Sequence, residues 1–498
     1  MRWRRLAIAA AAVLAAGLPA ASAHARETLQ VRLSRRYVAP GGQLAVSAAG
    51  FPSAAYVNLF LDQRFLRKAE VNADGTLTGL PLVIPSSTRP GLHKVVVATT
   101  GGGTVVAWRR VHVSVPWSTY AGGLARTGDN ERETLIDERS VEGLHVVWRR
   151  PLPGVRDPVN ASESVAIAGG SLFTSTCNGN LVAIRRGSGR MRWQTQLPGE
   201  APYAVTVRGR FVYAAWEDGF GAFDRHSGAL RWSHRETFPG SPAVTRTLAL
   251  VAASGRVEAY DRRTGELRWL MTIGGMLTTG QYTTPAVARG VVYVAGPASV
   301  TAIALVNGGA DVIWQHDLGG DPTSERNVST PLLYGGRVYV STGDGNLVAL
   351  DGSTGAEIWS DALSSTWQRP PNALTNLALS DGLLFVGAAD APGPTLDEQS
   401  ARVIAVSAAD GEVRWSHLVS TRFFEYGTPV VANGLVFDTT QSGRLFALDA
   451  QTGDLRWRSP RLGPIADVIP GSQVVVSDGH VYLGLDNLSV VALGLPAR

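Results

Sequence analysis

A fifteen-residue pattern that recurs along the chain constrains the fold more than any other feature of the sequence. Its clearest copy is GRLFALDAQTGDLRW, residues 443–457. Repeats 20 to 50 residues apart indicate that one supersecondary unit is used many times. Counting the clearest copy, seven copies end at Trp193, Trp232, Trp269, Trp314, Trp359, Trp415 and Trp457.

Each copy predicts a β-hairpin. Two runs rich in apolar residues flank a segment such as Asp449-Ala-Gln-Thr-Gly453, in which Asp and Thr side chains can bond turn amides and Gly can adopt a positive φ. An Ala lies ten residues before each repeat Trp, and a Gly lies four residues before it except where Ala310 stands. These small residues indicate close approach between neighbouring units. We interpret the turn aspartates as hairpin caps rather than catalytic acids: Asp224, Asp261, Asp351 and Asp449.

A second pair of strands precedes each hairpin, for example TPVVANGLVFDTT at residues 428–440. Four antiparallel strands in about 40 residues are typical of a β-propeller blade. Three further strands follow Trp457 without a final Trp, and residues 144–148 form an outer strand that has no preceding blade. The sequence therefore predicts an all-β, eight-bladed β-propeller closed by strand 144–148. Its expected wedges between blades are Trp148, Trp193, Trp232, Trp269, Trp314, Trp359, Trp415 and Trp457.

Residues 1–25 have the features of a secretory signal peptide. Three arginines precede the apolar run LAIAAAAVLAAGL, and Ala23-His24-Ala25 fits a cleavage site. We expect cleavage after Ala25 and export, to the periplasm or out of the cell. The signal contains no Cys, so no lipid anchor is expected, and no later run is apolar enough to predict a membrane span. Without the three signal arginines the formal net charge falls from +5 to +2, which gives no reason to expect nucleic acid as a partner.

Residues 26–115 differ from the repeats. Short alternating strands are separated by turns such as Pro40-Gly-Gly and Asp74-Gly75, which predicts a small β-sandwich. The segments around Val38-Ala-Pro-Gly-Gly and Pro90-Gly-Leu-His resemble immunoglobulin-like modules of bacterial secreted proteins. That resemblance implies a spacer or docking domain.

The repeats, preceded by WSTYAGGLARTG at residues 117–128, resemble the pyrroloquinoline-quinone-like (PQQ-like) propeller superfamily over residues 117–498. The resemblance implies a propeller domain at residues 116–498. The superfamily includes quinoprotein dehydrogenases and the non-catalytic lipoprotein propeller of outer-membrane barrel assembly. The adjacent cysteine pair of many quinoprotein alcohol dehydrogenases is missing, since the chain has a single Cys.

Catalytic signatures are mostly absent from the repeat region. No Lys follows Lys94, so the repeats contain no P-loop, no Schiff-base lysine and no S-x-x-K nucleophile. Motifs of the types G-x-S-x-G and H-E-x-x-H are also missing. We predict no catalytic residue, no metal ligand and no bound cofactor.

Long loops offer the best candidate for a binding surface. The interval between Trp359 and Trp415 is the longest of the series at 56 residues, and aromatic and arginine side chains favoured at interfaces gather in its loops and the flanking ones. The predicted binding residues are Arg326, Trp367, Arg369, Arg422, Phe424, Glu425 and Tyr426.

Three functions are compatible with these features. The preferred one is an exported, non-catalytic propeller that binds a protein or another cell-envelope ligand through its loop face. The second is a dehydrogenase of alcohols or sugars that uses PQQ and Ca²⁺. The third is a carbohydrate-binding or adhesive module in which the sandwich is a spacer.

Overall fold

The computed structural model describes residues 29–496 except 54, 101–105, 155–164, 177, 201–203, 217, 236–240, 254, 274–283, 297–298, 307–308, 320–327, 364–373, 391–399, 421–426, 441–442, 463–472 and 486–488. The chain divides into two compact units. The first contains Leu44–Leu82, Lys94–Arg110 and the chain up to Ser34. The second contains Arg35–Gln43, Val83–His93 and Val111–Arg498. Within the described ranges no helix is long and apolar enough to cross a membrane.

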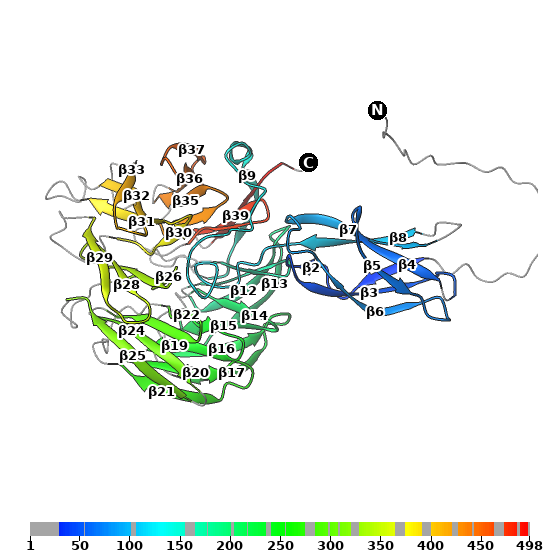
Figure 1. Ribbon diagram of the computed structural model, residues 1–498, viewed down its shortest axis with the longest axis horizontal. Helices are drawn as coiled ribbons and strands as arrows, with labels where there is room; N and C mark the ends of the chain where they lie inside the picture. Colours follow the sequence, from blue (N-terminus) through cyan, green and yellow to red (C-terminus); the bar gives the residue numbers. More distant parts are fainter. Residues whose placement is uncertain are drawn as a thin grey trace, which may run out of the picture. The chain divides into compact units, whose positions relative to one another are not determined.

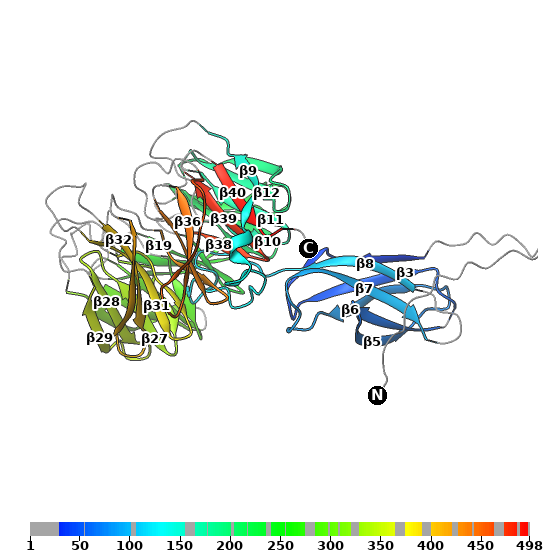
Figure 2. The same cartoon turned by 90° about the horizontal axis from the view of Figure 1, so that it is seen from above.

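The N-terminal strands form a three-stranded and a five-stranded sheet (blue in Figure 2). Alternate residues of β3 (Gln43–Ala49) and β4 (Tyr56–Leu61) are buried, as expected where one face of a sheet covers a core. The three-stranded sheet has the order β1 (Gln30–Leu33), β3 (Gln43–Ala49) and β6 (Leu77–Val83). The five-stranded sheet has the order β2 (Tyr37–Val38), β8 (Val106–Val113), β7 (Gly91–Thr99), β4 (Tyr56–Leu61) and β5 (Arg64–Glu70).

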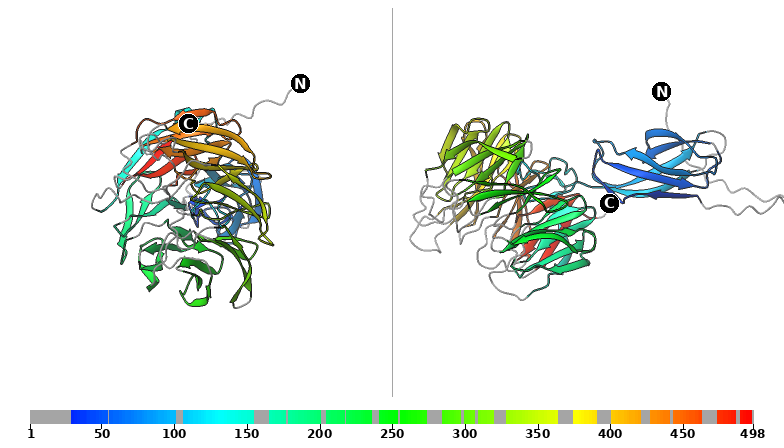
Figure 3. Two further views of the ribbon diagram at one scale, coloured as in Figure 1. Left: turned by 90° about the vertical axis from the view of Figure 1, so that its left-hand side faces the viewer. Right: turned by 90° about the horizontal axis from the view of Figure 1, so that it is seen from below.

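Eight four-stranded sheets follow in the described part of the second unit, and we number them R1 to R8. Figure 1 and Figure 3 show them side by side around a common centre. R1 contains β10 (Ala166–Ala168), β11 (Ser171–Ser175), β12 (Asn180–Arg185) and β13 (Met191–Gln196); R2 contains β14 (Thr206–Arg208), β15 (Phe211–Trp216), β16 (Gly219–Asp224) and β17 (Leu230–Arg235); R3 contains β18 (Ala243–Val244), β19 (Leu248–Ala253), β20 (Arg256–Asp261) and β21 (Leu267–Thr272); R4 contains β22 (Ala286–Ala288), β23 (Val291–Ala295), β24 (Ser299–Val306) and β25 (Gly309–Asp317).

The remaining sheets have the same plan. R5 contains β26 (Leu332–Tyr334), β27 (Arg337–Ser341), β28 (Asn346–Asp351) and β29 (Glu357–Ala362); R6 contains β30 (Ala378–Ser380), β31 (Leu383–Asp390), β32 (Ser400–Ser407) and β33 (Val413–Ser420); R7 contains β34 (Val430–Ala432), β35 (Leu435–Thr440), β36 (Arg444–Asp449) and β37 (Leu455–Arg458); R8 contains β38 (Val475–Ser477), β39 (His480–Leu485), β40 (Ser489–Gly494) and β9 (His145–Pro151). A short 3-10 helix, η1 (Val141–Gly143), precedes β9.

R8 combines the two ends of the repeat region. Strand β40 pairs antiparallel with β9, so that Ala492 lies opposite Trp148. The same Ala–Trp pairing joins the third and fourth strands in R1, where Ala183 lies opposite Trp193. The pairing protects the edge of β40, which would otherwise expose free backbone groups.

The repeated aspartates cap their hairpins, as the sequence predicts. The carboxylate of Asp449 accepts hydrogen bonds from the amides of Gln451 and Thr452, both at 2.8 Å. Asp351 accepts corresponding bonds from the amides of Ser353 and Thr354 at 2.9 Å. Both carboxylates are therefore occupied by their own turns.

The repeated glycines fit against tryptophans of the preceding sheet. Gly453 has φ +77°, and a Cβ atom placed there would lie 2.7 Å from the Trp415 ring. The indole of Trp415 also donates a hydrogen bond of 3.0 Å to the carbonyl of Ala450 in the same turn. The close approach that the sequence predicts at these glycines is confirmed, and it is an approach of turn to indole.

The R4 hairpin differs in register from the others by two residues. Ala304 stands ten residues before Trp314, but the residue opposite Trp314 is Ala302, and Ala304 pairs with Asp311. The strands β24 and β25 extend their pairing to Val306 and Gly309, so this hairpin is longer than the others. The longer hairpin also explains why Ala310 stands where the other copies have Gly.

Replacing Gly453 by Ala is expected to lower the free energy of unfolding by about 3 kcal/mol, because the Cβ adds a clash with Trp415 to the cost of a positive φ. Gly290 is the matched control: its φ is +82°, yet nothing lies within 4 Å of the position that an added Cβ would take. Gly290→Ala should therefore cost only about 1 kcal/mol. Urea unfolding of both variants measures the difference, and equal losses would contradict the packing role.

Candidate binding surface

The predicted loop residues have no described position. Arg326, Trp367, Arg369, Arg422, Phe424, Glu425 and Tyr426 all lie outside the described residues. The described part of the second unit instead shows three features that bear on function: its centre, the junctions between neighbouring sheets, and a pocket at one of these junctions.

The centre of the repeat region is crossed by residues 117–130. Their carbonyls accept hydrogen bonds of 2.6 to 2.9 Å from the first strands of six sheets. These strands face the centre, where their inner edges would otherwise lack partners, so the segment satisfies amides that no neighbouring strand can reach. The amides are those of Ile167, Val207, Val287, Leu333, Leu379 and Val431.

Arg126 anchors this central segment. It has φ +60° and is only 1% exposed. Its guanidinium donates to the carbonyls of Pro285 (3.0 Å) and Tyr120 (2.7 Å) and to the hydroxyl of Thr119 (2.8 Å). Burial lowers the pKa of Arg126 to about 9, and no carboxylate pairs with it in the described structure. Main-chain oxygens thus provide the counterpart of a buried cation.

The dehydrogenase alternative would require a site for PQQ and Ca²⁺ in the repeat region. A Ca²⁺ site requires six to eight oxygen ligands, usually including several carboxylates. No group of three or more His, Cys, Asp or Glu side chains suited to a metal occurs within the described ranges. The buried Glu133 is occupied, because it accepts hydrogen bonds from the amides of Leu135 (2.7 Å) and Gly479 (3.1 Å).

Junctions between sheets are lined by two kinds of turn: the turn between the first two strands of one sheet and the turn between the last two strands of the next. At the R8–R1 junction these turns contribute Asp478 and Arg186, which form a buried ion pair. Arg186 also donates to the Tyr482 hydroxyl at 2.8 Å. Burial acts against the charge of Arg186, but Tyr482 and Asp478 outweigh it and raise the pKa of this arginine. The junction is filled and neutralised by its own side chains.

Arginines also gather at the R1–R2 and R2–R3 junctions. Burial lowers the pKa of Arg225, and the nearby Arg35 and Arg192 lower it further. Burial and Arg262 likewise lower the pKa of Arg208. The carboxylate of Asp224 acts in the opposite direction on Arg225, so the arginines of the R1–R2 junction lie beside a carboxylate as well as beside each other.

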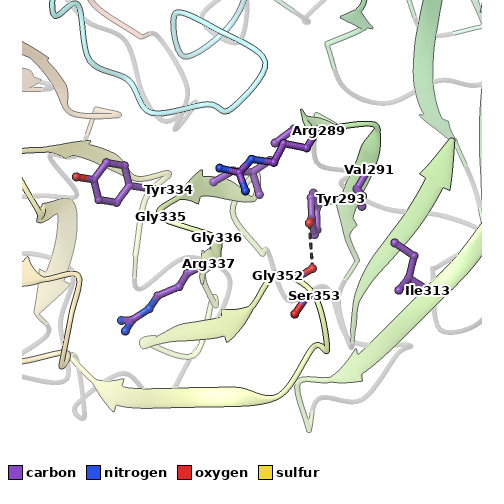
Figure 4. A pocket seen from close by; sticks show the side chains of 12 residues that line it. Arg289, Val291, Tyr293, Ile313, Tyr334, Gly335, Gly336, Arg337, Gly352 and Ser353 are labelled. Atoms are coloured by element: carbon purple, nitrogen blue, oxygen red, sulfur yellow. Dashed lines mark hydrogen bonds between the residues drawn. The ribbon is translucent and has the colours of Figure 1, made fainter.

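The R4–R5 junction is open. A pocket of about 410 Å³ lies there, and Figure 4 shows its lining side chains, with Arg289 near the middle of the view. Its walls include Val291, Ile313 and Tyr334, and the Tyr293 hydroxyl donates a 3.0 Å hydrogen bond to the carbonyl of Gly352 (dashed in Figure 4). Pockets of this size can accept small ligands or single side chains.

Sequence reasoning missed this pocket, although a signal for it exists. The residue after the turn aspartate is Arg225 in R2 and Arg262 in R3, but Gly352 in R5. Because Gly352 has no side chain, the space that an arginine would occupy at this position is left to the pocket. A larger residue is disfavoured at position 352, because an added Cβ would lie 2.6 Å from the carbonyl oxygen of Gly336.

The ring-like arrangement of four-stranded sheets with Trp-ended hairpins defines a β-propeller of the PQQ-like class, and the predicted all-β, PQQ-like fold is confirmed. A family model described as outer membrane protein assembly factor BamB matches residues 142–283, 221–372 and 364–495. The chain belongs to this family.

Individual relatives agree with this assignment. The outer membrane protein assembly factor BamB of Yersinia pestis is 24% identical over 340 residues, which cover 64% of this chain and 80% of the relative. The solved structure of BamB from Moraxella catarrhalis has a TM-score of 0.52 at 18% identity and covers 71% of this chain and 98% of its own. A quinohemoprotein alcohol dehydrogenase from Comamonas testosteroni has a TM-score of 0.59 at 16% identity, covering 77% of this chain and 81% of its own. At such identities the structural likeness shows the fold alone.

Proposed function

We propose that this chain is an exported, non-catalytic scaffold that binds a protein partner in the cell envelope. The observation that carries the proposal is the position of the central segment, residues 117–130. Its carbonyls accept hydrogen bonds from the inner edges of the first strands, so these edges have a structural role. Membership of a family described as an outer membrane protein assembly factor supports the same function.

The proposal includes an architecture. Residues 116–498 form one closed ring of eight blades, R1 to R8, and the β9–β40 pairing supports closure by strand 144–148. Residues 26–115 form an immunoglobulin-like sandwich that acts as a spacer or docking domain. A signal peptide cleaved after Ala25 directs the chain to the periplasm or out of the cell.

The proposed partner surface is the loop face. It contains the seven residues predicted from the sequence, with Trp367, Arg369 and Tyr426 as its anchors. Aromatic and arginine side chains contribute most to interfaces when a partner excludes water from them.

Replacing Trp367, Arg369 and Tyr426 by Ala is expected to abolish partner capture while leaving the melting temperature nearly unchanged, because exposed loop residues contribute little to stability. The measurement is a pull-down from the native envelope fraction, with mass spectrometry to compare the proteins retained by wild type and by variant. Wild-type capture by the triple variant would contradict the assignment of the loop face.

A quinoprotein dehydrogenase is the second candidate, favoured by the likeness to the Comamonas enzyme's fold. Purified protein is incubated with PQQ and Ca²⁺, and dye reduction is followed with alcohols and sugars. We expect no turnover above a sample without protein. Turnover would overturn the non-catalytic proposal. Binding to a glycan array without protein capture would instead favour the carbohydrate-binding alternative.

A further inference from the structure

We propose that the R4–R5 pocket binds a segment of a partner protein in which a carboxylate side chain stands next to an apolar one. The inference rests on the proposed protein-binding function and adds to it a second contact surface, on the turn side of the sheets. It is drawn from a comparison between two junctions of the same molecule.

The R8–R1 junction provides the internal template. Asp478 lies in the turn between β38 and β39 with φ +49°, and Arg186 of the next sheet fills the space above the Tyr482 ring at 5.5 Å from its centre. A carboxylate of one sheet and a guanidinium of the next thus form an ion pair across the junction. Both side chains are at least nine-tenths buried.

At the R4–R5 junction both positions have changed. Arg289, with φ +50°, stands where R8 has Asp478, and Gly352 stands where R1 has Arg186. Tyr293 occupies the place of Tyr482. The R4–R5 junction therefore retains the tyrosine. Its turn has a cation, Arg289, instead of an anion, and the opposing residue, Gly352, has no side chain. A carboxylate from outside would restore the pair with its charges exchanged.

The charges around the pocket support an anionic occupant. Arg289 has no hydrogen-bonded or ion-paired partner among the described residues. Arg337, at the rim, donates to the carbonyls of Ala408 (2.9 Å) and Ala409 (2.8 Å) of R6, so its guanidinium is engaged outside the pocket. The nearby Asp351 accepts four hydrogen bonds from Ser353 and Thr354 of its own turn. Arg289 is thus the pocket cation that lacks a carboxylate partner among the described residues, and the Oδ1 atom of Asp351 serves its own turn.

The pocket walls support an apolar neighbour of that carboxylate. Ile313 is 45% exposed and Tyr334 is 46% exposed, and both line the pocket together with Val291. The volume of about 410 Å³ exceeds what a carboxylate alone requires. An aromatic or branched aliphatic side chain would cover these apolar surfaces and exclude water from the Arg289 ion pair, which strengthens it.

The test uses four synthetic peptides of the form acetyl-Ser-X-Z-Ser-amide, in which X-Z is Glu-Phe, Gln-Phe, Lys-Phe or Glu-Gly. Binding to the full chain is followed by NMR titration of the peptide signals. We expect Glu-Phe to bind at least tenfold more tightly than each of the other three. No binding of Glu-Phe at millimolar concentration, or equal binding of Glu-Phe and Gln-Phe, would overturn the proposal.

Charge reversal gives the decisive variant. Arg289→Asp restores the residue type that R8 has at this position, and Asp tolerates a positive φ, so the fold should be retained. The variant should lose Glu-Phe binding at least tenfold and should prefer Lys-Phe instead. Arg246→Asp, at the corresponding position of R3, is the matched control and should leave the wild-type preference intact.

Two further outcomes are informative. If Arg289→Asp leaves the preference for Glu-Phe unchanged, the pocket is not the binding site and the proposal fails. If light scattering shows that the chain dimerises and the Glu-Phe peptide dissociates the dimer, a second copy occupies the pocket and the proposal also fails. Peptide binding is measured on purified protein, whereas the loop face is tested by capture from the envelope fraction. Failure of the pocket proposal is therefore distinguishable from failure of the loop-face proposal.

Discussion

Deleting the chain up to residue 136 is expected to abolish cooperative unfolding of the repeat region even though β9 is retained. The deletion removes the carbonyls that accept six hydrogen bonds from the first strands, as well as the anchor Arg126. At about 1 kcal/mol each, six buried hydrogen bonds amount to a large part of the roughly 5–15 kcal/mol that stabilises a typical domain. The unsatisfied amides would add a further cost.

Three fragments separate the central segment from strand β9. Fragment 116–498 retains both and should melt cooperatively. Fragment 137–498 retains only β9, and fragment 152–498 lacks both, so its β40 edge is also unpaired. Calorimetry and near-ultraviolet circular dichroism measure the result. If 137–498 melts like 116–498, the central segment is dispensable, and if 152–498 does so, the pairing of β9 with β40 is dispensable too.

Asp438→Asn is expected to stabilise the protein strongly at neutral pH. Asp438, on β35, is 1% exposed, and burial raises its pKa to about 7, although the amides of Thr439 and Gly427 act in the opposite direction. Because this folded pKa lies above the value of 3.8 for an exposed Asp, the wild type gains stability as the pH falls from about 7 to about 4. Above pH 7 the Asp438 carboxylate is charged in the folded state, and its burial then lowers the free energy of unfolding by the full amount. A difference of about three pKa units corresponds to about 4 kcal/mol at most.

The measurement is chemical unfolding of wild type and Asp438→Asn between pH 4 and pH 8. The advantage of the variant should be largest at pH 8 and should vanish near pH 4. Asp351→Asn is the control of opposite sign. Hydrogen bonds from Ser353 and Thr354 lower the pKa of Asp351 to about 2, so its replacement should destabilise the protein above pH 4. A pH-independent effect of Asp438→Asn would show that the folded state does not raise the pKa of Asp438 above its value in the unfolded chain.

The hairpins were predictable because their determinants are local. An Asp carboxylate bonds amides two and three residues ahead, as Asp449 does with Gln451 and Thr452, and a Gly four residues before the Trp adopts a positive φ. Both effects depend on short-range backbone geometry, which the sequence pattern reports directly. The spacing alone did not report the register of the R4 hairpin, because counting residues back from Trp314 cannot detect a longer hairpin.

The candidate site was less accessible to sequence reasoning. The loop residues around Trp367 remain a prediction, whereas the pocket at Arg289 comes from turns of two different sheets. Gly352 and Arg289 are 63 residues apart in the sequence, and each alone resembles an ordinary turn residue. Only their juxtaposition, and its contrast with Arg186 and Asp478, gives the pocket its charge.

The sequence by itself determined the repeated unit of this protein: the hairpin, its Asp cap, its Gly and its Trp. These depend on contacts within about fifteen residues, so they recur wherever the pattern recurs. Only the tertiary structure decided what lies between units. Residues 117–130 crossing the centre, the partners of Arg126 and the open R4–R5 junction depend on which distant segments meet. The physical reason is that an inner strand edge or a buried charge is satisfied by whatever group the fold brings within hydrogen-bond distance, and that group is not encoded in its neighbours along the chain.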